Sequence, residues 1–263
     1  MNSLDPIVAA TREEVRRRKL QITEVQLERA ASQRASGDRR SLLDAIAAPG
    51  VSVIAEHKRR SPSAGLIRGE LALEDVVCAY ERGGASALSI LTEGPSFGGS
   101  LEDLRAARAA AALPILRKDF IVERYQVLES FAAGADAILL IVAALSPGEL
   151  VTLQGEADAY GLTALVEVHD EAQLEAAAAS GARLIGINNR DLTTLAVNRH
   201  RTLELLPGVP AGTPVVAESG FSAPAQLAQL AQAGISAVLI GEALMRAPDV
   251  EAACRRLAGI TAF

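Results

Sequence analysis

The sequence contains no tryptophan and few other aromatic residues, with five Phe and three Tyr among 263 residues. It is nevertheless 49% hydrophobic. A chain this apolar excludes global disorder, and its core has to be built mainly from Ala, Val, Leu and Ile. The length suits one large α/β barrel or two smaller domains.

Cysteine is also scarce. The two cysteines, Cys78 and Cys254, each lie in a helix-like apolar pattern. Two isolated cysteines exclude a disulfide framework and indicate no metal site, so we expect free, buried thiols.

Long hydrophobic runs are missing, and so is an excess of positive charge. No apolar run reaches the length of a membrane span. Met1 to Thr11 has no basic-then-apolar leader pattern, and the net charge of −6 argues against a nucleic-acid surface. We therefore expect a cytoplasmic protein that binds neither membrane nor nucleic acid.

One stretch near the N-terminal third joins a hydrophobic run to a charged one. Val51 to Ala55 has the short, largely β-branched side chains of a strand buried on both faces. Glu56 and Lys58 follow on one face of that strand, and loop residues 61–65 come next. Charges at the end of a buried strand need a partner. On this stretch alone, a structural ion pair and a ligand site are equally compatible readings.

From Val51 onward, strand and helix patterns alternate. The apolar patterns predict strands at 51–56, 85–91, 114–118, 136–142, 162–168, 183–187, 213–218 and 236–240. Ala- and Leu-rich patterns predict helices at 73–82, 100–111, 122–132, 147–159, 170–179, 199–205, 223–232 and 248–258. Several helical patterns close with Gly, which tolerates a left-handed cap, and the Ser146-Pro147 pair is typical of a helix start.

Eight such units predict an α/β fold, a (β/α)8 or TIM barrel. Residues 3–35 are predicted to form a charged helix, 36–40 a loop and 41–47 a short helix. We thus expect one domain over 1–263, in which 1–50 is an N-terminal helical extension. The alternative is a doubly wound open sheet, but no Gly-x-Gly-x-x-Gly turn follows the first strand.

Polar residues concentrate where the predicted strands end, whereas the strand starts are mostly Gly, Ala and Pro. In a (β/α)8 barrel the strand ends carry the active site. Lys58, Lys118 and Arg190 collect there in an acidic protein, which favours a small anionic ligand. Glu218-Ser219-Gly220 and Gly241-Glu242 follow the last two strands, where such barrels often bind phosphate. Glycine after a strand is also a plain turn signal.

Each polar residue at a strand end could have a purely structural role instead of a functional one. Lys118 follows the apolar run 114–116 and should point near the mouth rather than lie free on the surface. Glu167, between two valines, should act as a base or acid or pair with a lysine. Asn188 and Arg190 share a face and could instead satisfy loop backbone groups.

Other residues near the strand ends are read as structural or apolar. His57 alternates away from its charged neighbours and should pack toward the helices. Asp119 and Asp191 should cap or pair rather than catalyse. Phe97 and Phe120 form either core or an apolar wall for a ring.

Six segments together resemble one enzyme family. They are Ala55-Glu-His-Lys-Arg-Arg-Ser-Pro-Ser63, Leu116-Arg-Lys-Asp-Phe-Ile-Val122, Leu165-Val-Glu-Val168, Gly186-Ile-Asn-Asn-Arg-Asp-Leu192, Ala217-Glu-Ser-Gly220 and Leu239-Ile-Gly-Glu-Ala-Leu-Met245. In this order and at these strand ends they resemble the indole-3-glycerol-phosphate synthase family of tryptophan biosynthesis. The resemblance runs from about residue 51 to the end, and the charged N-terminal extension fits it.

The resemblance implies a reaction and a substrate. A carbon–carbon carboxy-lyase of this family closes the ring of 1-(2-carboxyphenylamino)-1-deoxyribulose 5-phosphate, and then releases carbon dioxide and water to give indole-3-glycerol phosphate. No metal or organic cofactor is implied. We expect a monomer or a weak homodimer.

By the same resemblance, each matched residue has an implied role. Lys118 is the general acid at the ribulose carbonyl, Lys58 binds anionic groups and assists dehydration, Glu167 is the general base or acid of later steps, and Glu56 tunes the lysines. Asn188 and Ser219 belong to the family's catalytic site. Substrate contacts are implied for Ser61, Phe97, Phe120, Arg190 and Glu218, and phosphate contacts for Gly220, Gly241 and Glu242.

Two expectations about the charged groups follow from this chemistry. Ring closure needs an acid at the developing alkoxide, and dehydration needs an acid and a base. We therefore expect the lysine pKa values to be lowered and that of Glu167 to be raised. The sequence departs from the family's usual pattern at His57 and at Ala64, where a lysine is frequent, and Ala64 should weaken substrate attraction slightly.

Two other functions fit a barrel of this kind. A Schiff-base aldolase also uses a strand-end lysine, and a non-catalytic barrel could merely bind a phosphorylated metabolite. The set of Lys58, Lys118 and Glu167 argues against mere binding. We also expect the N-terminal helix, placed before the first strand, to close over the ligand.

Overall fold

The strands form a closed parallel barrel in the computed structural model, which describes residues 4–34 and 38–259. Around the barrel the order is β1-β10-β9-β8-β7-β6-β5-β4, so β1 pairs with both β4 and β10. This closure confirms the (β/α)8 barrel and rules out the doubly wound sheet. The strands are β1 (Ser52–His57), β4 (Ala87–Leu91), β5 (Ile115–Lys118), β6 (Ala137–Ile141), β7 (Thr163–Val168), β8 (Ile185–Asn188), β9 (Val215–Glu218) and β10 (Ala237–Ile240).

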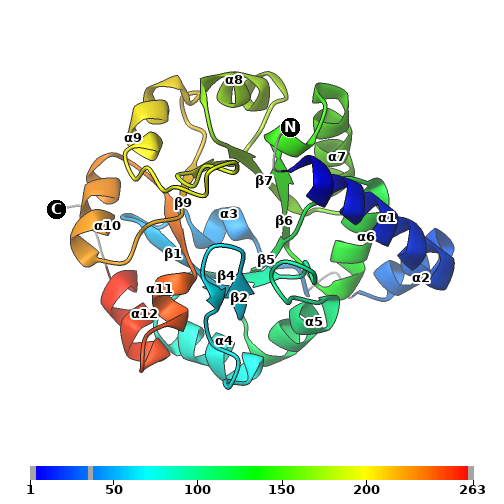
Figure 1. Cartoon of the computed structure of the whole chain (residues 1–263), viewed down its shortest axis with the longest axis horizontal. Helices are drawn as coiled ribbons and strands as arrows, with labels where there is room; N and C mark the ends of the chain where they lie inside the picture. Colours follow the sequence, from blue (N-terminus) through cyan, green and yellow to red (C-terminus); the bar gives the residue numbers. More distant parts are fainter. Residues whose placement is uncertain (1–3, 35–37, 260–263) are drawn as a thin grey trace.

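Helices surround the barrel in the order that the alternation predicts (Figure 1). They are α4 (Leu73–Arg82), α5 (Leu101–Ala110), α6 (Arg124–Ala133), α7 (Pro147–Ala159), α8 (Glu171–Ala179), α9 (Arg201–Leu205), α10 (Pro224–Gln232) and α12 (Val250–Ala258). Local signals explain their ends. Ser146 caps α7 with Pro147 in the first turn, and Gly134 closes α6 at φ 98°.

Five short elements are missing from the sequence-based prediction. A hairpin of β2 (Arg60–Ser61) and β3 (Gly65–Leu66) lies in the loop after β1, and α11 (Glu242–Met245) follows β10. Two 3₁₀ turns, η2 (Val142–Ala144) and η3 (Leu206–Gly208), complete the set. Each has only two to four residues, too few to repeat the patterns from which the longer elements are read.

The prediction of one N-terminal helix over 3–35 is wrong, because the chain breaks at Thr23. Helices α1 (Asp5–Gln21) and α2 (Glu24–Gln33) meet there. The Thr23 hydroxyl accepts from the Gln26 N–H, and the Gln26 side chain accepts from the Thr23 N–H, so a capping box starts α2. Both helices lie beside α6 on the outside of the barrel (Figure 1). Part of the predicted 36–40 loop lies outside the described residues.

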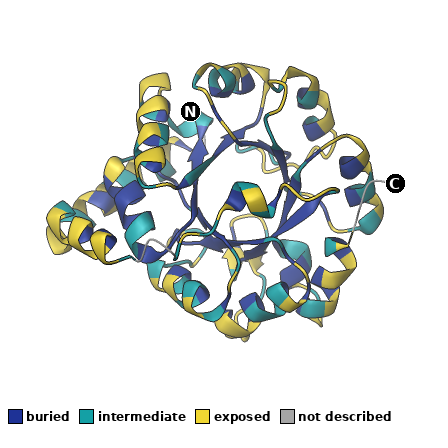
Figure 2. Ribbon diagram, turned by 180° about the vertical axis from the view of Figure 1, so that it is seen from behind, coloured by how far each residue is buried: buried dark blue, intermediate teal, exposed yellow. Residues whose placement is uncertain are grey.

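A short helix plugs the end of the barrel where the strands start. This helix, α3 (Leu42–Ala45), corresponds to the predicted 41–47 helix and crosses the barrel centre in Figure 2. Leu42 and Ile46 join the inner barrel core with Ile54, Leu116 and Leu165. This end is therefore filled, and only the strand ends remain open for a site.

Aliphatic side chains dominate both core layers, as the scarcity of aromatic residues predicts. Both cysteines are free; Cys254 is buried as expected, but Cys78 is only partly buried. None of the helices in the described ranges combines the length and apolar character of a membrane span.

Candidate active site

A cavity of about 610 Å³ opens at the strand ends. It brings together every residue that the sequence analysis assigns to the site: Glu56, Lys58, Ser61, Phe97, Lys118, Phe120, Glu167, Asn188, Arg190, Glu218, Ser219, Gly220, Gly241 and Glu242. Lining residues that the sequence analysis did not assign include Leu4, Ile7, Glu93, Leu192 and Arg246. Leu4 and Ile7 come from the start of the N-terminal extension, far from the barrel in sequence.

Lys118 lies between two carboxylates at the floor of the cavity. Its Nζ is 3.0 Å from Glu167 Oε2 and 3.3 Å from Glu218 Oε2. The two glutamate side chains are 2% exposed and the lysine 15%. A single ammonium thus bridges a strand β7 acid and a strand β9 acid, and all three side chains are largely buried.

The expected pKa pattern is wrong for Lys118 and Glu167, because each neutralises the other. Burial lowers the Lys118 pKa, but the carboxylates of Glu167, Glu218 and Glu56 raise it by more, above its ordinary value. Burial raises the Glu167 pKa, and Lys118, His169 and hydrogen bonds from Lys118 and Asn188 together lower it to about 2. At neutral pH the lysine is therefore an ammonium and Glu167 a carboxylate.

Glu218 is the acid whose pKa is raised. Burial raises it most, the Lys118 charge lowers it, and the negative charge of Glu167 with a hydrogen bond to that residue raises it again, to about 8. Two adjacent carboxylates that face one ammonium do not readily both ionise. The cavity thus holds a charged donor, an ionised acceptor and a protonated carboxyl group.

Glu56 and Lys58 form the ion pair that the β1 stretch suggested, with Lys58 Nζ 2.8 Å from Glu56 Oε1. Both also line the cavity, so the structural and the ligand-site readings hold together. Gly241 lies against this pair, since a Cβ there would be 2.5 Å from Glu56 Oε1. Glycine at 241 therefore leaves room for the Glu56 side chain.

His169 is a buried neighbour of the site that the sequence analysis missed. Its Nε2 is 3.3 Å from Glu167 Oε1, and its Nδ1 is 3.2 Å from Gln173 Oε1. The sequence contained a signal, because alternate residues of an extended chain fall on one face, and His169 follows Glu167 by two residues just beyond the end of β7. His169 adds to the positive surroundings of Glu167.

The loop after β8 satisfies its own backbone while it lines the cavity. Asn188 Oδ1 accepts from the Arg190 N–H at 3.0 Å, and Arg190 Nη1 donates to the Leu195 carbonyl at 2.9 Å. Asp191 accepts from the N–H groups of Thr193 and Thr194, so it caps a turn as expected. The alternative that Asn188 and Arg190 hydrogen-bond to loop backbone groups is therefore correct. Both residues nevertheless line the cavity.

Three further predicted residues form the opposite wall. Ser61 is buried, and its hydroxyl accepts from the Ala64 N–H at 3.2 Å. Phe97 is partly buried in a loop whose Ser96 and Phe97 N–H groups donate to Glu93. Phe120 is 9% exposed, so the phenylalanines serve both as inner core and as an apolar cavity wall.

The loop after β9 turns through two consecutive residues with positive φ. Ser219 and Gly220 have φ values of 66° and 92°. A Cβ at residue 220 would be 2.6 Å from Val197 Cγ1, so only glycine fits. In the loop after β10 the Glu242 carboxylate pairs with Arg246 at 2.9 Å, and Gly241 and Glu242 both line the cavity.

His57 and Asp119 behave as the sequence analysis predicts. His57 is 3% exposed on the helix side of β1, and burial lowers its pKa to about 4. Asp119 pairs with Arg117 at 2.8 Å and lines the cavity as well. In the described parts of the chain, no group of three or more His, Cys, Asp or Glu side chains is arranged to hold a metal ion.

Comparison with known proteins gives a consistent result. Residues 4–257 match the family model described as indole-3-glycerol phosphate synthase. A protein of that name from Nocardioides sp. is 53% identical over 81% of this chain and 82% of its own length. Another, from Sulfurimonas denitrificans, is 46% identical over 97% of each chain. A solved 3-hexulose-6-phosphate synthase has a TM-score of 0.65 at 15% identity, covering 81% of this chain and 100% of its own, which shows the shared barrel fold.

Proposed function

The chain belongs to the indole-3-glycerol phosphate synthase family, decarboxylating lyases of tryptophan biosynthesis, and from this premise we propose how its cavity works. The substrate is 1-(2-carboxyphenylamino)-1-deoxyribulose 5-phosphate. The Lys118–Glu167–Glu218 arrangement is the observation that supports the assignment of roles, because it supplies a charged proton donor beside an ionised acceptor.

Lys118 protonates the ribulose carbonyl oxygen while the ring carbon attacks. An alkoxide that develops on this oxygen is about as basic as hydroxide, whose conjugate acid has a pKa of about 15.7. A raised lysine pKa therefore still permits proton transfer, and the full positive charge stabilises the oxygen throughout the step. Carbon dioxide then leaves and the ring becomes aromatic again.

Dehydration uses the groups around Lys118. Glu167, ionised and 3.0 Å from Lys118, serves as the base. Lys58, held by Glu56, donates a proton to the leaving hydroxyl. Glu218, which the sequence analysis placed among the substrate contacts, supplies a second protonated group, and Asn188 helps to keep Glu167 ionised.

Binding is divided between two sides of the cavity. Phe97 and Phe120 contact the anthranilate ring, and Ser61 and Arg190 hold anionic groups. The backbone of Ser219-Gly220 and Gly241-Glu242 binds the phosphate. We further propose that residues 1–263 act as one barrel domain in the cytoplasm, as a monomer or weak homodimer, without cofactor or nucleic-acid partner.

The aldolase alternative is disfavoured by the charge on Lys118. A Schiff base requires a neutral lysine, and the surrounding carboxylates raise the pKa of this one. The chain has only three lysines, Lys19, Lys58 and Lys118, so borohydride trapping with a keto-phosphate gives an unambiguous answer. The proposal expects no adduct on Lys58 or Lys118.

The experiment that tests the function is an emission assay with the carboxyphenylamino-deoxyribulose phosphate. Because the chain contains no tryptophan, new indole fluorescence is visible over its background. We expect emission that grows with enzyme concentration and with time. Folded protein that gives no emission and no carbon dioxide would overturn the synthase assignment and favour a barrel that only binds the metabolite.

The start of the N-terminal extension should contribute to substrate binding. Leu4 is buried, Ile7 is partly buried, and both line the cavity. We expect Leu4→Ser and Ile7→Ser each to raise KM by about 5- to 30-fold, since a buried aliphatic side chain contributes roughly 1–2 kcal/mol. Leu20→Ser is the control, because Leu20 lies on the same helix and is 88% exposed. Unchanged KM in both cavity variants would remove the idea that this helix closes over the ligand.

A further inference from the structure

Arg117 precedes Lys118 in β5 and points to the opposite face of the strand. Lys118 faces the cavity, whereas Arg117 lies fully buried between the strand and helix α6. A guanidinium without access to water has to be both hydrogen-bonded and paired with charge. Arg117 is costly to bury and directly precedes the proposed general acid, so core packing alone does not explain an arginine at this position.

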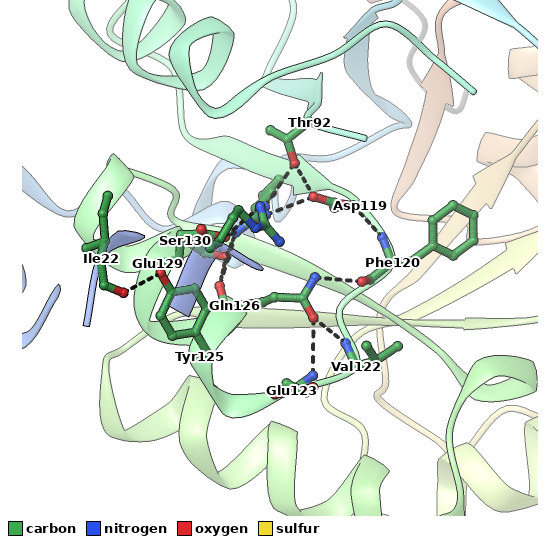
Figure 3. Close-up of polar contacts among 12 residues, drawn as sticks. Ile22, Thr92, Asp119, Phe120, Val122, Glu123, Tyr125, Gln126, Glu129 and Ser130 are labelled. Carbon is green, nitrogen blue, oxygen red and sulfur yellow. Dashed lines mark hydrogen bonds and ion pairs between the residues drawn. The ribbon is translucent and has the colours of Figure 1, made fainter. Parts of the chain in front are cut away.

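The group around Arg117, here named the Arg117 cluster, consists of Arg18, Thr92, Arg117, Asp119, Gln126, Glu129 and Ser130. Arg117 Nε donates to Thr92 Oγ1 at 2.9 Å, and Nη2 donates to Asp119 Oδ2 at 2.8 Å. Nη1 donates to Glu129 Oε2, Ser130 Oγ and the Gln126 carbonyl at 2.9–3.1 Å. Figure 3 shows Thr92, Asp119, Gln126, Glu129 and Ser130 converging on this centre.

The same cluster fixes the loop directly after Lys118. Asp119 Oδ1 accepts from the Phe120 N–H at 2.8 Å, and Gln126 Nε2 donates to the Phe120 carbonyl at 2.8 Å. Gln126 Oε1 accepts from the N–H groups of Val122 and Glu123 (Figure 3). The backbone on either side of the Phe120 ring is thus tied to side chains of the cluster. Arg117 is therefore linked to Phe120 through Asp119 on one side and through Gln126 on the other.

The outer end of the cluster belongs to helix α1. Arg18 Nη1 is 3.2 Å from Glu129 Oε2, the same oxygen that binds Arg117. Two guanidinium groups then face the two carboxylates of Asp119 and Glu129, and without Arg18 the buried charge does not balance. Helix α1 also pairs Lys19 with Glu123 at 2.6 Å. Charge on α1 is therefore part of the structure that holds the β5–α6 loop.

Resting on the function proposed above, we propose that Arg117 and Arg18 are positioning residues for the reaction. The Arg117 cluster couples helix α1 to the β5–α6 loop and holds Lys118 and Phe120 in register with the substrate. The N-terminal extension then acts on the acid step through buried charge, independently of the contacts that Leu4 and Ile7 make in the cavity.

The test uses three variants: Arg18→Gln, Glu129→Gln and the double variant that carries both of these changes. Each is compared with Arg17→Gln. Arg17 lies on the same helix, is 63% exposed and pairs with the exposed Glu14, so it is the matched control. Arg18→Gln is preferred to Arg117→Met because its side chain is 22% exposed and its loss leaves the barrel core intact. The readouts are kcat, inhibition by inorganic phosphate, melting temperature and hydrogen exchange of the peptide over 119–123.

We expect Arg18→Gln to lower kcat by about 10- to 100-fold, since displacements near 1 Å at a catalytic group have effects of this size. Exchange in 119–123 should accelerate, phosphate inhibition should stay unchanged, and Arg18→Lys should restore most of the activity. The double variant should lie closer to wild type than Arg18→Gln alone, because it removes both charges. A lower melting temperature with kcat and exchange equal to those of Arg17→Gln would overturn the proposal. If the wild-type protein lacked synthase activity, the proposed function would fail. Hydrogen exchange of the peptide over 119–123 would still show whether Arg18 couples helix α1 to the β5–α6 loop.

Discussion

Lys118→Met is expected to lower kcat by about 10²- to 10⁴-fold, the range for loss of a positioned acid, with a smaller change in KM. Lys118 Nζ lies 3.0 Å from Glu167 and 3.3 Å from Glu218, so the variant removes a cation that both acids contact. Methionine keeps the length and most of the volume of the side chain. The developing alkoxide then loses its proton donor and its stabilising charge in the same change.

A surface-cation control separates this effect from a general loss of charge. Arg16→Met removes one positive charge from the exposed face of α1, where Arg16 pairs with Glu13 and is 68% exposed. It should retain kcat within about 3-fold, since exposed ion pairs contribute little. Steady-state emission assays with all three proteins give the comparison. Equal kcat in Lys118→Met and wild type would show that the acid of ring closure is another group.

Glu167→Gln is expected to have the second large effect. We expect it to separate ring closure and decarboxylation from the later dehydration. The amide keeps the shape of the side chain but cannot accept a proton in dehydration. We expect kcat for indole formation to fall by about 10²- to 10⁴-fold. Lys118 retains Glu218 as a partner at 3.3 Å and remains able to protonate the carbonyl. Ring closure and decarboxylation should therefore proceed faster than dehydration.

The measurement for Glu167→Gln follows both products in a single turnover. Carbon dioxide should appear ahead of indole emission, with a lag that wild type lacks. Glu175→Gln, on the exposed face of α8, is the matched control and should show no lag. Loss of both signals to the same extent would place Glu167 in ring closure rather than in dehydration.

The barrel and the composition of its mouth are predictable from the sequence because they depend on local periodicity. Buried parallel strands are continuous apolar runs, and their polar ends collect at one face. The break at Thr23 also had a local signal, Thr23 followed by Gln26, and a closer reading of capping patterns would have found it. Elements of two to four residues, such as β2 and α11, lie below the resolution of any periodic pattern.

The charge states of the site were not predictable, because they depend on which groups face one another across the barrel. Glu167 and Glu218 lie on β7 and β9, with β8 between them. Gly186 of β8 makes room for the pair, since a Cβ there would be 2.3 Å from Glu218 Oε1. Burial and the Glu167 charge then raise the Glu218 pKa to about 8, while Glu167 itself stays ionised. No spacing along the chain encodes that difference.

The protonation state of Lys118 tests the central claim most directly. With only three lysines, protein labelled with ¹⁵N-lysine gives three side-chain amine signals, which Lys19→Met and Lys118→Met assign. We predict that the Lys118 signal keeps the ammonium shift well above the ordinary lysine pKa of about 10.4, and that Glu167→Gln moves its titration to lower pH. A Lys118 signal that loses its proton below pH 10.4 would contradict the account, because the surrounding carboxylates would then not raise the pKa of this lysine.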